Sequence, residues 1–170
     1  MTRTLTSICT MLLLASSTLL TACGYTQTEL FDTQYQTVAT PIFENKSFER
    51  DVEFQLTEAL TKELELRTPY KVVNRTTAET VLSGTITSVR HKLLSRTFEG
   101  GIAQEIQLIV NVSYEWKDTK TGKVIRKRGQ LSGTGEYLPA RGTSEPIEVA
   151  KHQAVAEIAR DLVSSLRKDW

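Results

Sequence analysis

The sequence predicts an α+β domain, a two-layer sandwich in which two helices cover a mainly antiparallel sheet of about four strands. Three observations support this fold class. Two segments carry apolar residues at helical spacing, one long segment alternates apolar and polar residues, and turn residues separate the expected strands. One covered face and one solvent-exposed face are typical of an antiparallel sheet. Both amphipathic helices are therefore expected on the same face.

The chain begins with a segment typical of a bacterial lipoprotein signal, residues 1–22. Arg3 is its only charge, Ile8–Leu20 is apolar or small, and Leu20-Thr21-Ala22 precedes Cys23. A membrane-spanning helix needs about 20 apolar residues, so this stretch predicts a removable signal instead. We expect cleavage before Cys23, with a diacylglycerol on its sulfur and a further acyl chain on the new amino group. The alternative is an ordinary signal peptide that happens to contain a cysteine.

Cleavage has consequences for chemistry and location. Cys23 would be the one remaining cysteine, held in a thioether, which excludes a disulfide, a cysteine nucleophile and a cysteine-based zinc site. Loss of Arg3 would leave 20 basic against 20 acidic residues, whereas nucleic-acid binders have a basic excess. Gly24, in place of an aspartate that retains lipoproteins at the inner membrane, favours the outer membrane. We expect a tether over 23–36 and one periplasm-facing domain over 37–170.

The first elements of this domain are a short strand and a helix. Thr37–Phe43 is apolar, with Pro41 suited to a strand end or an edge, and Glu44–Ser47 has loop chemistry. The helix is expected to end before Pro69 and to begin with Ser47 or Asp51 as its cap. Its apolar face repeats every four residues: Phe48, Val52, Leu56, Leu60 and Leu64, with Ala59 beside them.

A short strand at Tyr70–Val73 and three long strands follow. Thr80–Leu94 alternates imperfectly, and Gly84 is expected to mark a bulge. Gln104–Trp116 alternates most regularly, and Asp118–Gly122 predicts a hairpin loop. Lys123–Tyr137 is the return strand, whose glycines permit bends or bulges: Gly129, Gly133 and Gly135.

The last element is a helix that runs nearly to Trp170. Thr143–Pro146 supplies a capping hydroxyl and a proline for its first turn. Its apolar face comprises Ile147, Ala150, Ala154, Ile158, Leu162 and Leu166. We expect the core between helices and sheet to include Leu56, Leu60, Leu108, Val110, Ile158 and Leu162.

The sequence gives no positive support for an enzyme, a cofactor or a metal. His91 and His152 have no ligand-spaced partner, so exposed or structural histidines are expected. Pairs such as Asp51 and Glu53 are two residues apart on a helix and do not face each other. Gly100-Gly101 lacks the lysine and the strand-to-helix context of a phosphate loop.

Two basic clusters carry the candidate lipid-binding or anion-binding residues. Arg90 and Lys92 lie near the end of one expected strand, and Arg126 and Arg128 lie in another. One interpretation is edge protection and solubility, since exposed strands often carry basic residues. The other is an anion site, because arginine fits phosphate through two parallel hydrogen bonds.

The sequence resembles a known family over essentially the whole mature chain. The residues that carry the resemblance are Cys23-Gly24-Tyr25, Thr37–Asn45, Glu58-Ala59-Leu60, Arg67 and Val81–Ile86. They are similar to a divergent branch of the LptE family of lipopolysaccharide-assembly lipoproteins. The resemblance implies two helices on a four-stranded sheet, and anchoring at the outer membrane. It also implies a complex with the β-barrel LptD, in which the lipoprotein is a plug and supports delivery of lipopolysaccharide to the outer leaflet.

A second resemblance leads to a different function. Val38–Asn45 is also similar to the opening strand of periplasmic lipoproteins that activate cell-wall synthases by protein–protein contact. Those proteins usually carry a long disordered linker. Only about a dozen residues separate Cys23 from the first expected strand here, which favours a partner close to the membrane.

Overall fold

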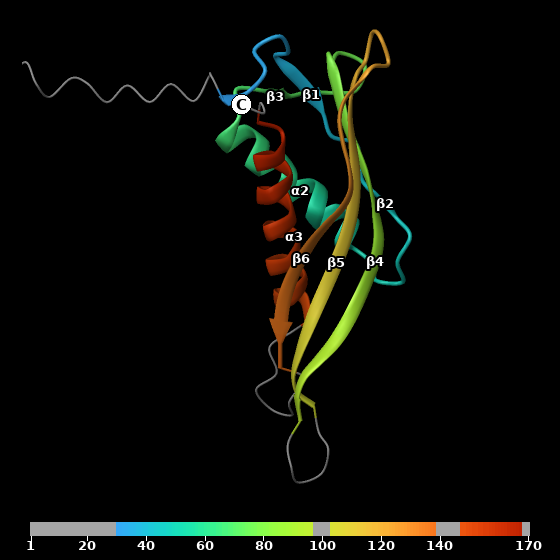
Figure 1. Ribbon diagram of the computed structural model, residues 1–170, viewed down its shortest axis with the longest axis vertical. Helices are drawn as coiled ribbons and strands as arrows, with labels where there is room; N and C mark the ends of the chain where they lie inside the picture. Colours follow the sequence, from blue (N-terminus) through green and yellow to red (C-terminus); the bar gives the residue numbers. More distant parts are fainter. Residues whose placement is uncertain (1–29, 97–102, 139–146, 168–170) are drawn as a thin grey trace, which may run out of the picture.

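The computed structural model describes residues 30–96, 103–138 and 147–167. Two helices lie side by side on one face of a long, twisted sheet (Figure 1). The expected α+β class with both helices on one face is therefore confirmed. In chain order the elements are β1 (Thr37–Ala39), β2 (Glu44–Asn45), α2 (Val52–Arg67), β3 (Lys71–Val72), β4 (Thr80–Arg96), β5 (Ala103–Asp118), β6 (Val124–Tyr137) and α3 (Ile147–Ser165).

The sheet is mixed and has six strands, which corrects the expected count of about four and the mainly antiparallel arrangement. Its order is β3-β1-β4-β5-β6, with β2 also paired to β4. The three long strands are antiparallel, as predicted, but β1 pairs in parallel with β3 and β4, and β2 pairs in parallel with β4. Parallel neighbours need a crossover connection, and α2 supplies it between β1 and β3.

The entry into α2 differs from the expectation in two ways. Glu44 and Asn45, expected in a loop, form β2. Phe48, expected on the apolar stripe, is fully exposed, because the helix begins only at Val52. Asp51 occupies the N-cap position in the left-handed conformation, with φ 69°, and its side chain makes no capping hydrogen bond. This turn of the backbone separates Phe48 from the helical face.

The core lies between the helices and the sheet, and its six predicted members are all confirmed as fully buried: Leu56, Leu60, Leu108, Val110, Ile158 and Leu162. The predicted end of the first helix before Pro69 is confirmed, since α2 ends at Arg67. The last helix ends earlier than predicted, at Ser165. Its expected start over Thr143–Pro146 lies outside the described residues.

A β-bulge explains the imperfect alternation of β4. Ile86 pairs with Val112 and Ser88 with Asn111, so Thr87 is the extra residue. The bulge reverses which residues face the helices: Leu82 and Ile86, both even-numbered, face them before it, and the odd-numbered Val89 faces them after it. The bulge was predicted at Gly84, which has another role: the ring of Phe43 packs where a Cβ would lie.

Glycines of β6 let α3 pack directly on the sheet. A Cβ on Gly133 or Gly135 would overlap the carbonyl oxygen of Ala154 or Ala150, respectively. Of the three glycines predicted to permit bends, Gly129 does lie in a bulge, where two residues of β6 oppose one of β5.

The end of the expected tether packs on the domain. Phe31 is buried, and its ring contacts Tyr70 edge to face, with centroids 5.9 Å apart. The rings of Tyr35 and Tyr70 both contact Trp116, at 6.0 and 5.6 Å between centroids. The hydroxyl of Tyr70 donates to the backbone carbonyl of Asp32. Residues 31–36 therefore belong to the packed structure, whereas Cys23 lies outside the described residues.

Candidate functional site: the basic strand residues and an adjoining polar network

Arg90 and Lys92 lie on the sheet face that the helices leave uncovered. Arg90 pairs across strands with Ile109, and Lys92 pairs with Gln107. Cross-strand partners share a face, and these partners alternate with Leu108, which faces the helices and is fully buried. Both basic residues are exposed and lie in the second half of β4.

Arg126 and Arg128 lie on the opposite face, near the other end of the sheet. They pair with Trp116 and Tyr114, whose rings are buried on the helix side. Arg128 is exposed, whereas Arg126 is half-buried and interacts with neighbouring groups.

The structure therefore brings the four candidate residues together as two pairs and not as one site. Along β5, the partner of Arg90 is Ile109 and the partner of Arg128 is Tyr114. Five residues of a strand span about 17 Å. A single phosphate group cannot contact both pairs, so each pair is a separate candidate for anion binding.

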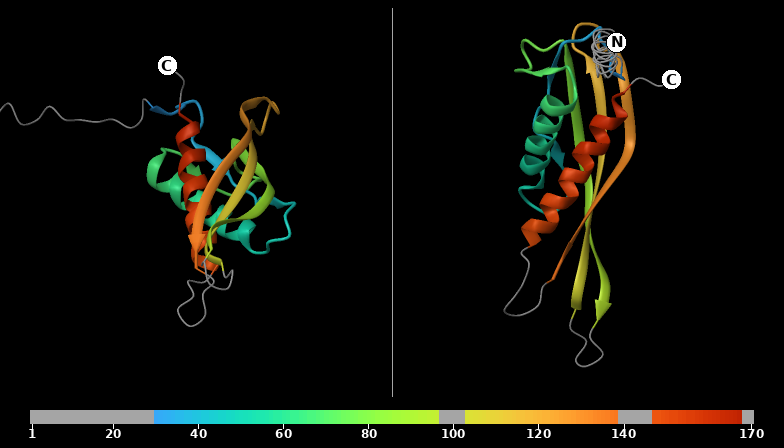
Figure 2. Two further views of the ribbon diagram at one scale, coloured as in Figure 1. Left: turned by 60° about the horizontal axis from the view of Figure 1, so that its bottom comes forward. Right: turned by 90° about the vertical axis from the view of Figure 1, so that its left-hand side faces the viewer.

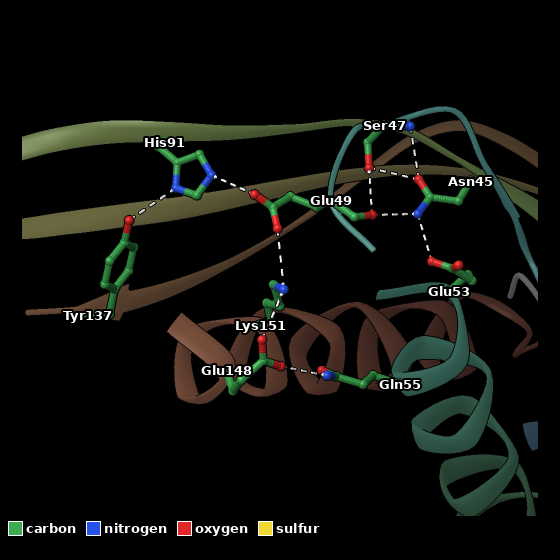
Figure 3. A network of polar contacts seen from close by, with 9 residues as sticks. All are labelled: Asn45, Ser47, Glu49, Glu53, Gln55, His91, Tyr137, Glu148 and Lys151. Carbon is green, nitrogen blue, oxygen red and sulfur yellow. Dashed lines mark hydrogen bonds and ion pairs between the residues drawn. The ribbon is translucent and has the colours of Figure 1, made fainter. Parts of the chain in front are cut away.

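A polar network that was not predicted from the sequence involves His91, which lies between Arg90 and Lys92 in the sequence but on the helix side of the sheet (Figure 3). Oε1 of Glu49 lies 3.2 Å from Nε2 of His91, and Oε2 of Glu49 lies 3.3 Å from Nζ of Lys151. The other ring nitrogen of His91 lies 3.3 Å from the hydroxyl of Tyr137. These contacts connect the loop before α2 to β4, β6 and α3.

Lys151 is the buried cation of this network, with 6% of its surface exposed. Its Nζ lies 3.0 Å from Oε1 of Glu148, whose Oε2 accepts a hydrogen bond from Gln55. Burial disfavours the charged ammonium, but hydrogen bonds to Glu148 and Glu49 outweigh burial and raise the pKa of Lys151. Hydrogen bonds from Lys151 and Gln55 lower the pKa of Glu148. Both groups are therefore charged at neutral pH.

Asn45 fixes the loop that carries Glu49. Its Nδ2 donates to the backbone carbonyl of Glu49 at 2.7 Å and to Oε2 of Glu53 at 2.6 Å. Its Oδ1 accepts the backbone N–H of Ser47 at 2.9 Å. The carboxylate of Glu49 is thereby held between β4 and α3.

The network has a structural role, because its contacts hold the loop before α2 against β4, β6 and α3. A tyrosine, a histidine and a carboxylate in series are an arrangement that enzymes use for proton transfer. Here both ring nitrogens of His91 and both oxygens of Glu49 already face protein partners. The structural role expected for His91 fits this arrangement. One sequence signal pointed to the network: Lys151 interrupts the apolar face of the last helix, and a buried lysine requires a charged partner.

A hollow on the uncovered sheet face was also missed from the sequence. It has a volume of about 450 Å³, and its lining includes three small hydroxyl residues, Ser83, Thr85 and Ser113. Arg75 and Lys127 also line it, together with Pro41, Ile42, Glu44 and Glu115. Its lining combines polar and apolar groups with charges of both signs.

The described residues contain neither a helix long and apolar enough to cross a membrane nor a group of three or more metal-ligating side chains. His152 is exposed on α3. Within residues 30–96, 103–138 and 147–167, the helices cover one face of the sheet and leave the other uncovered.

The chain belongs to the LptE family. The family model, described as LptE, lipopolysaccharide-assembly, matches residues 35–169, which is more than half of the chain. This match confirms the resemblance found in the sequence. No match is found among curated proteins.

Solved structures share the fold at low sequence identity. The PelC dodecamer from Paraburkholderia phytofirmans aligns with a TM-score of 0.53 and 16% identity, over 81% of this chain and 93% of that one. A hypothetical protein from Chlamydia trachomatis aligns at 0.50 and 11%, over 78% and 95%. A protein from Xanthomonas campestris aligns at 0.50 and 11%, over 76% and 82%. At these identities the likeness concerns the fold alone.

Proposed function

We propose that this chain is a lipopolysaccharide-assembly lipoprotein of the outer membrane. It is anchored through acyl chains on Cys23, faces the periplasm and forms a stable complex with an LptD-like β-barrel. In that complex it supports barrel assembly and the delivery of lipopolysaccharide to the outer leaflet. The observation that carries the proposal is the family match over residues 35–169. The role is non-enzymatic and needs no cofactor.

The anchor follows from the Leu20-Thr21-Ala22-Cys23 motif. Each buried CH₂ contributes about 0.8 kcal/mol, so two or three acyl chains hold a protein at a membrane where one does not. We expect Cys23→Ala to block lipidation and to release the protein from membranes or leave it as an uncleaved precursor. Mass spectrometry of the mature N-terminus tests this expectation. An unmodified Cys23 or a mature start elsewhere would contradict the anchor.

The barrel complex is tested by purification of the lipidated protein from native outer membrane, with identification of the proteins that accompany it. We expect an outer-membrane β-barrel at a fixed ratio to this chain, and loss of that barrel from the Cys23→Ala preparation. A cell-wall synthase in place of the barrel would favour the alternative, a periplasmic lipoprotein that activates such a synthase.

Direct contact with lipopolysaccharide is the finer part of the proposal. Its support is the exposure of Arg90 and Lys92 on one face and of Arg128, beside Arg126, on the other. A charge-assisted bond to phosphate contributes about 1.5–3 kcal/mol where it is partly desolvated. Reversal of both charges in one pair is expected to weaken lipid binding at least about tenfold, with the barrel complex intact.

Because the two pairs lie apart, separate double reversals identify which one binds. The matched control is Lys120→Glu with Lys123→Glu, which changes net charge equally in the exposed loop between β5 and β6. Unchanged lipid binding in both double variants would leave the basic pairs as ordinary solvated strand surface.

A further inference from the structure

The end of β4 and the start of β5 extend beyond the other described helices and strands, at the bottom of Figure 1 and of the right-hand view in Figure 2. Tyr137 at the end of β6 pairs with Ile106, whereas β4 and β5 stay paired as far as Arg96 and Ala103. A two-stranded ribbon is marginally stable by itself in water. The extension begins just after Leu93, whose partner on β5 is Ile106. The segment of β4 that leads into it, Ser88–Leu93, lies where β5 is also paired with β6.

The β4 edge that leads into this extension is open. In the first half of β4, this edge is paired with β1 at Thr80 and Val81 and with β2 at Thr85 and Ile86. In the described part of the chain, no further strand pairs with this edge between Ser88 and Leu93. Six residues of strand present about 20 Å of unpaired backbone.

At the opposite edge of the sheet, side chains of α3 occupy two backbone amides of β6. The backbone N–H groups of Thr134 and Glu136 on β6 donate to Glu157 and Gln153 of α3, at 2.7 and 3.2 Å. Side chains that occupy edge amides prevent the addition of a foreign strand. The two edges differ in this respect, and the β4 edge from Ser88 to Leu93 is the candidate for strand addition.

The side chains along this open edge differ between the two faces. Arg90 and Lys92 lie on the uncovered face, whereas Val89, His91 and Leu93 lie on the helix side. Leu93 is 36% exposed. A strand added here continues both faces, so its residues beside Arg90 and Lys92 face cations. The alternate residues lie beside Val89, His91 and Leu93, of which Val89 and Leu93 are apolar and His91 contacts Glu49 and Tyr137.

We propose that the β4 edge from Ser88 to Leu93 binds an extended segment of a partner protein, which alternates acidic and apolar residues and adds to the sheet as a strand. The main-chain hydrogen bonds supply affinity, and the alternate side chains supply specificity. The proposal concerns a partner other than the barrel, because the barrel complex is expected to survive reversal of Arg90 and Lys92.

A second copy of this chain is the wrong occupant. Edge-to-edge pairing of two β4 strands brings Arg90 and Lys92 of one copy beside the same cations of the other. Like charges on neighbouring strands are destabilising. Acidic side chains are the complement of this edge.

The experiment uses the full lipidated chain in detergent micelles and a fluorescent seven-residue peptide that alternates valine and glutamate. Controls are the same peptide with lysine for glutamate, and the glutamate peptide with alternate backbone amides N-methylated. We expect the glutamate peptide to bind at least about tenfold more tightly than either control. Hydrogen exchange should slow at the amides of 88–93.

Protein variants locate the site. Arg90→Glu with Lys92→Glu is expected to reverse the preference in favour of the lysine peptide, and Lys120→Glu with Lys123→Glu is expected to keep it. Equal binding of all three peptides, or slowed exchange confined to other segments, overturns the proposal. Slowed exchange at 88–93 that grows with protein concentration and needs no peptide overturns it in favour of self-association.

Discussion

The close approach of α3 to β6 depends on two glycines, and replacing them tests how the helix is held. Carbon atoms in contact lie about 3.5–4.0 Å apart. A Cβ on Gly135 would lie 2.7 Å from the carbonyl carbon of Ala150 and 2.8 Å from its Cα, and would overlap the carbonyl oxygen. The clash involves backbone of a helix, so no flexible side chain can relieve it. The helix must move away by about 1 Å.

The cost of Gly135→Ala is estimated from packing. Overpacking in a well-packed core costs about 1–3 kcal/mol. Movement of α3 also loosens the buried contacts of Ala150, Ala154 and Ile158, and the hydrogen bond that Gln153 accepts from the N–H of Glu136. We therefore expect the free energy of unfolding to fall by about 3 kcal/mol, at the upper end of that range.

Urea unfolding of the purified protein, followed by circular dichroism, measures this change. The matched control is Gly129→Ala, because a Cβ at Gly129 meets nothing within 4 Å. That control is expected to stay within about 0.5 kcal/mol of the original protein. Equal stability of the Gly135→Ala and Gly129→Ala proteins would refute the packing of α3 on the backbone of β6.

Three further predictions concern charged and polar groups. Hydrogen bonds from the backbone N–H groups of Gln36 and Thr37 lower the pKa of Glu79. The stability that its carboxylate contributes is therefore present above the ordinary glutamate pKa and is lost as pH falls below about 4.3. Glu79→Gln should flatten that part of the stability–pH curve measured by thermal unfolding. Lys151→Ala removes the cation between the partly exposed carboxylates of Glu49 and Glu148. It should lower the free energy of unfolding in urea by about 1–2 kcal/mol. An unchanged midpoint would be evidence against the network. Burial raises the pKa of Tyr70 to about 12. The stability that its neutral form contributes is therefore present below pH 10 and is lost as pH rises through about 12. The difference between the ultraviolet titrations of the original protein and Tyr70→Phe should show one phenol that ionises near pH 12, and ionisation near pH 10 would contradict this prediction.

The helices and long strands were predictable because their patterns repeat over many residues. The stripe of Leu56, Leu60 and Leu64 continues over more than two turns, and the alternation of β5 continues over its whole length. Each repeat adds evidence for the same period, so isolated exceptions do not obscure it.

The short parallel strands were not predictable, because two or three residues are too few to show a periodic pattern of apolar and polar residues. Glu44 and Asn45 are polar and pair with β4 only because the crossover through α2 brings them there. The bulge at Thr87 was equally hidden, since it appears in the sequence only as a change of phase between Ile86 and Val89. The placement of a bulge depends on the partner strand.

The candidate site could be predicted by residue type but not by arrangement. The basic residues are visible in the sequence, yet only the register shows that Arg90 and Arg128 lie on opposite faces. The polar network joins Glu49, His91 and Lys151 across up to about a hundred residues of chain. Contacts at such separations follow from the fold and leave little trace in local patterns.

Depletion of this protein in its native cells, followed by measurement of lipopolysaccharide on the cell surface, tests the central claim most directly. The account predicts that surface lipopolysaccharide falls and that the partner barrel loses its folded form, while the rate of peptidoglycan synthesis is unchanged. Normal surface lipopolysaccharide and a folded barrel, with reduced peptidoglycan synthesis, would contradict it.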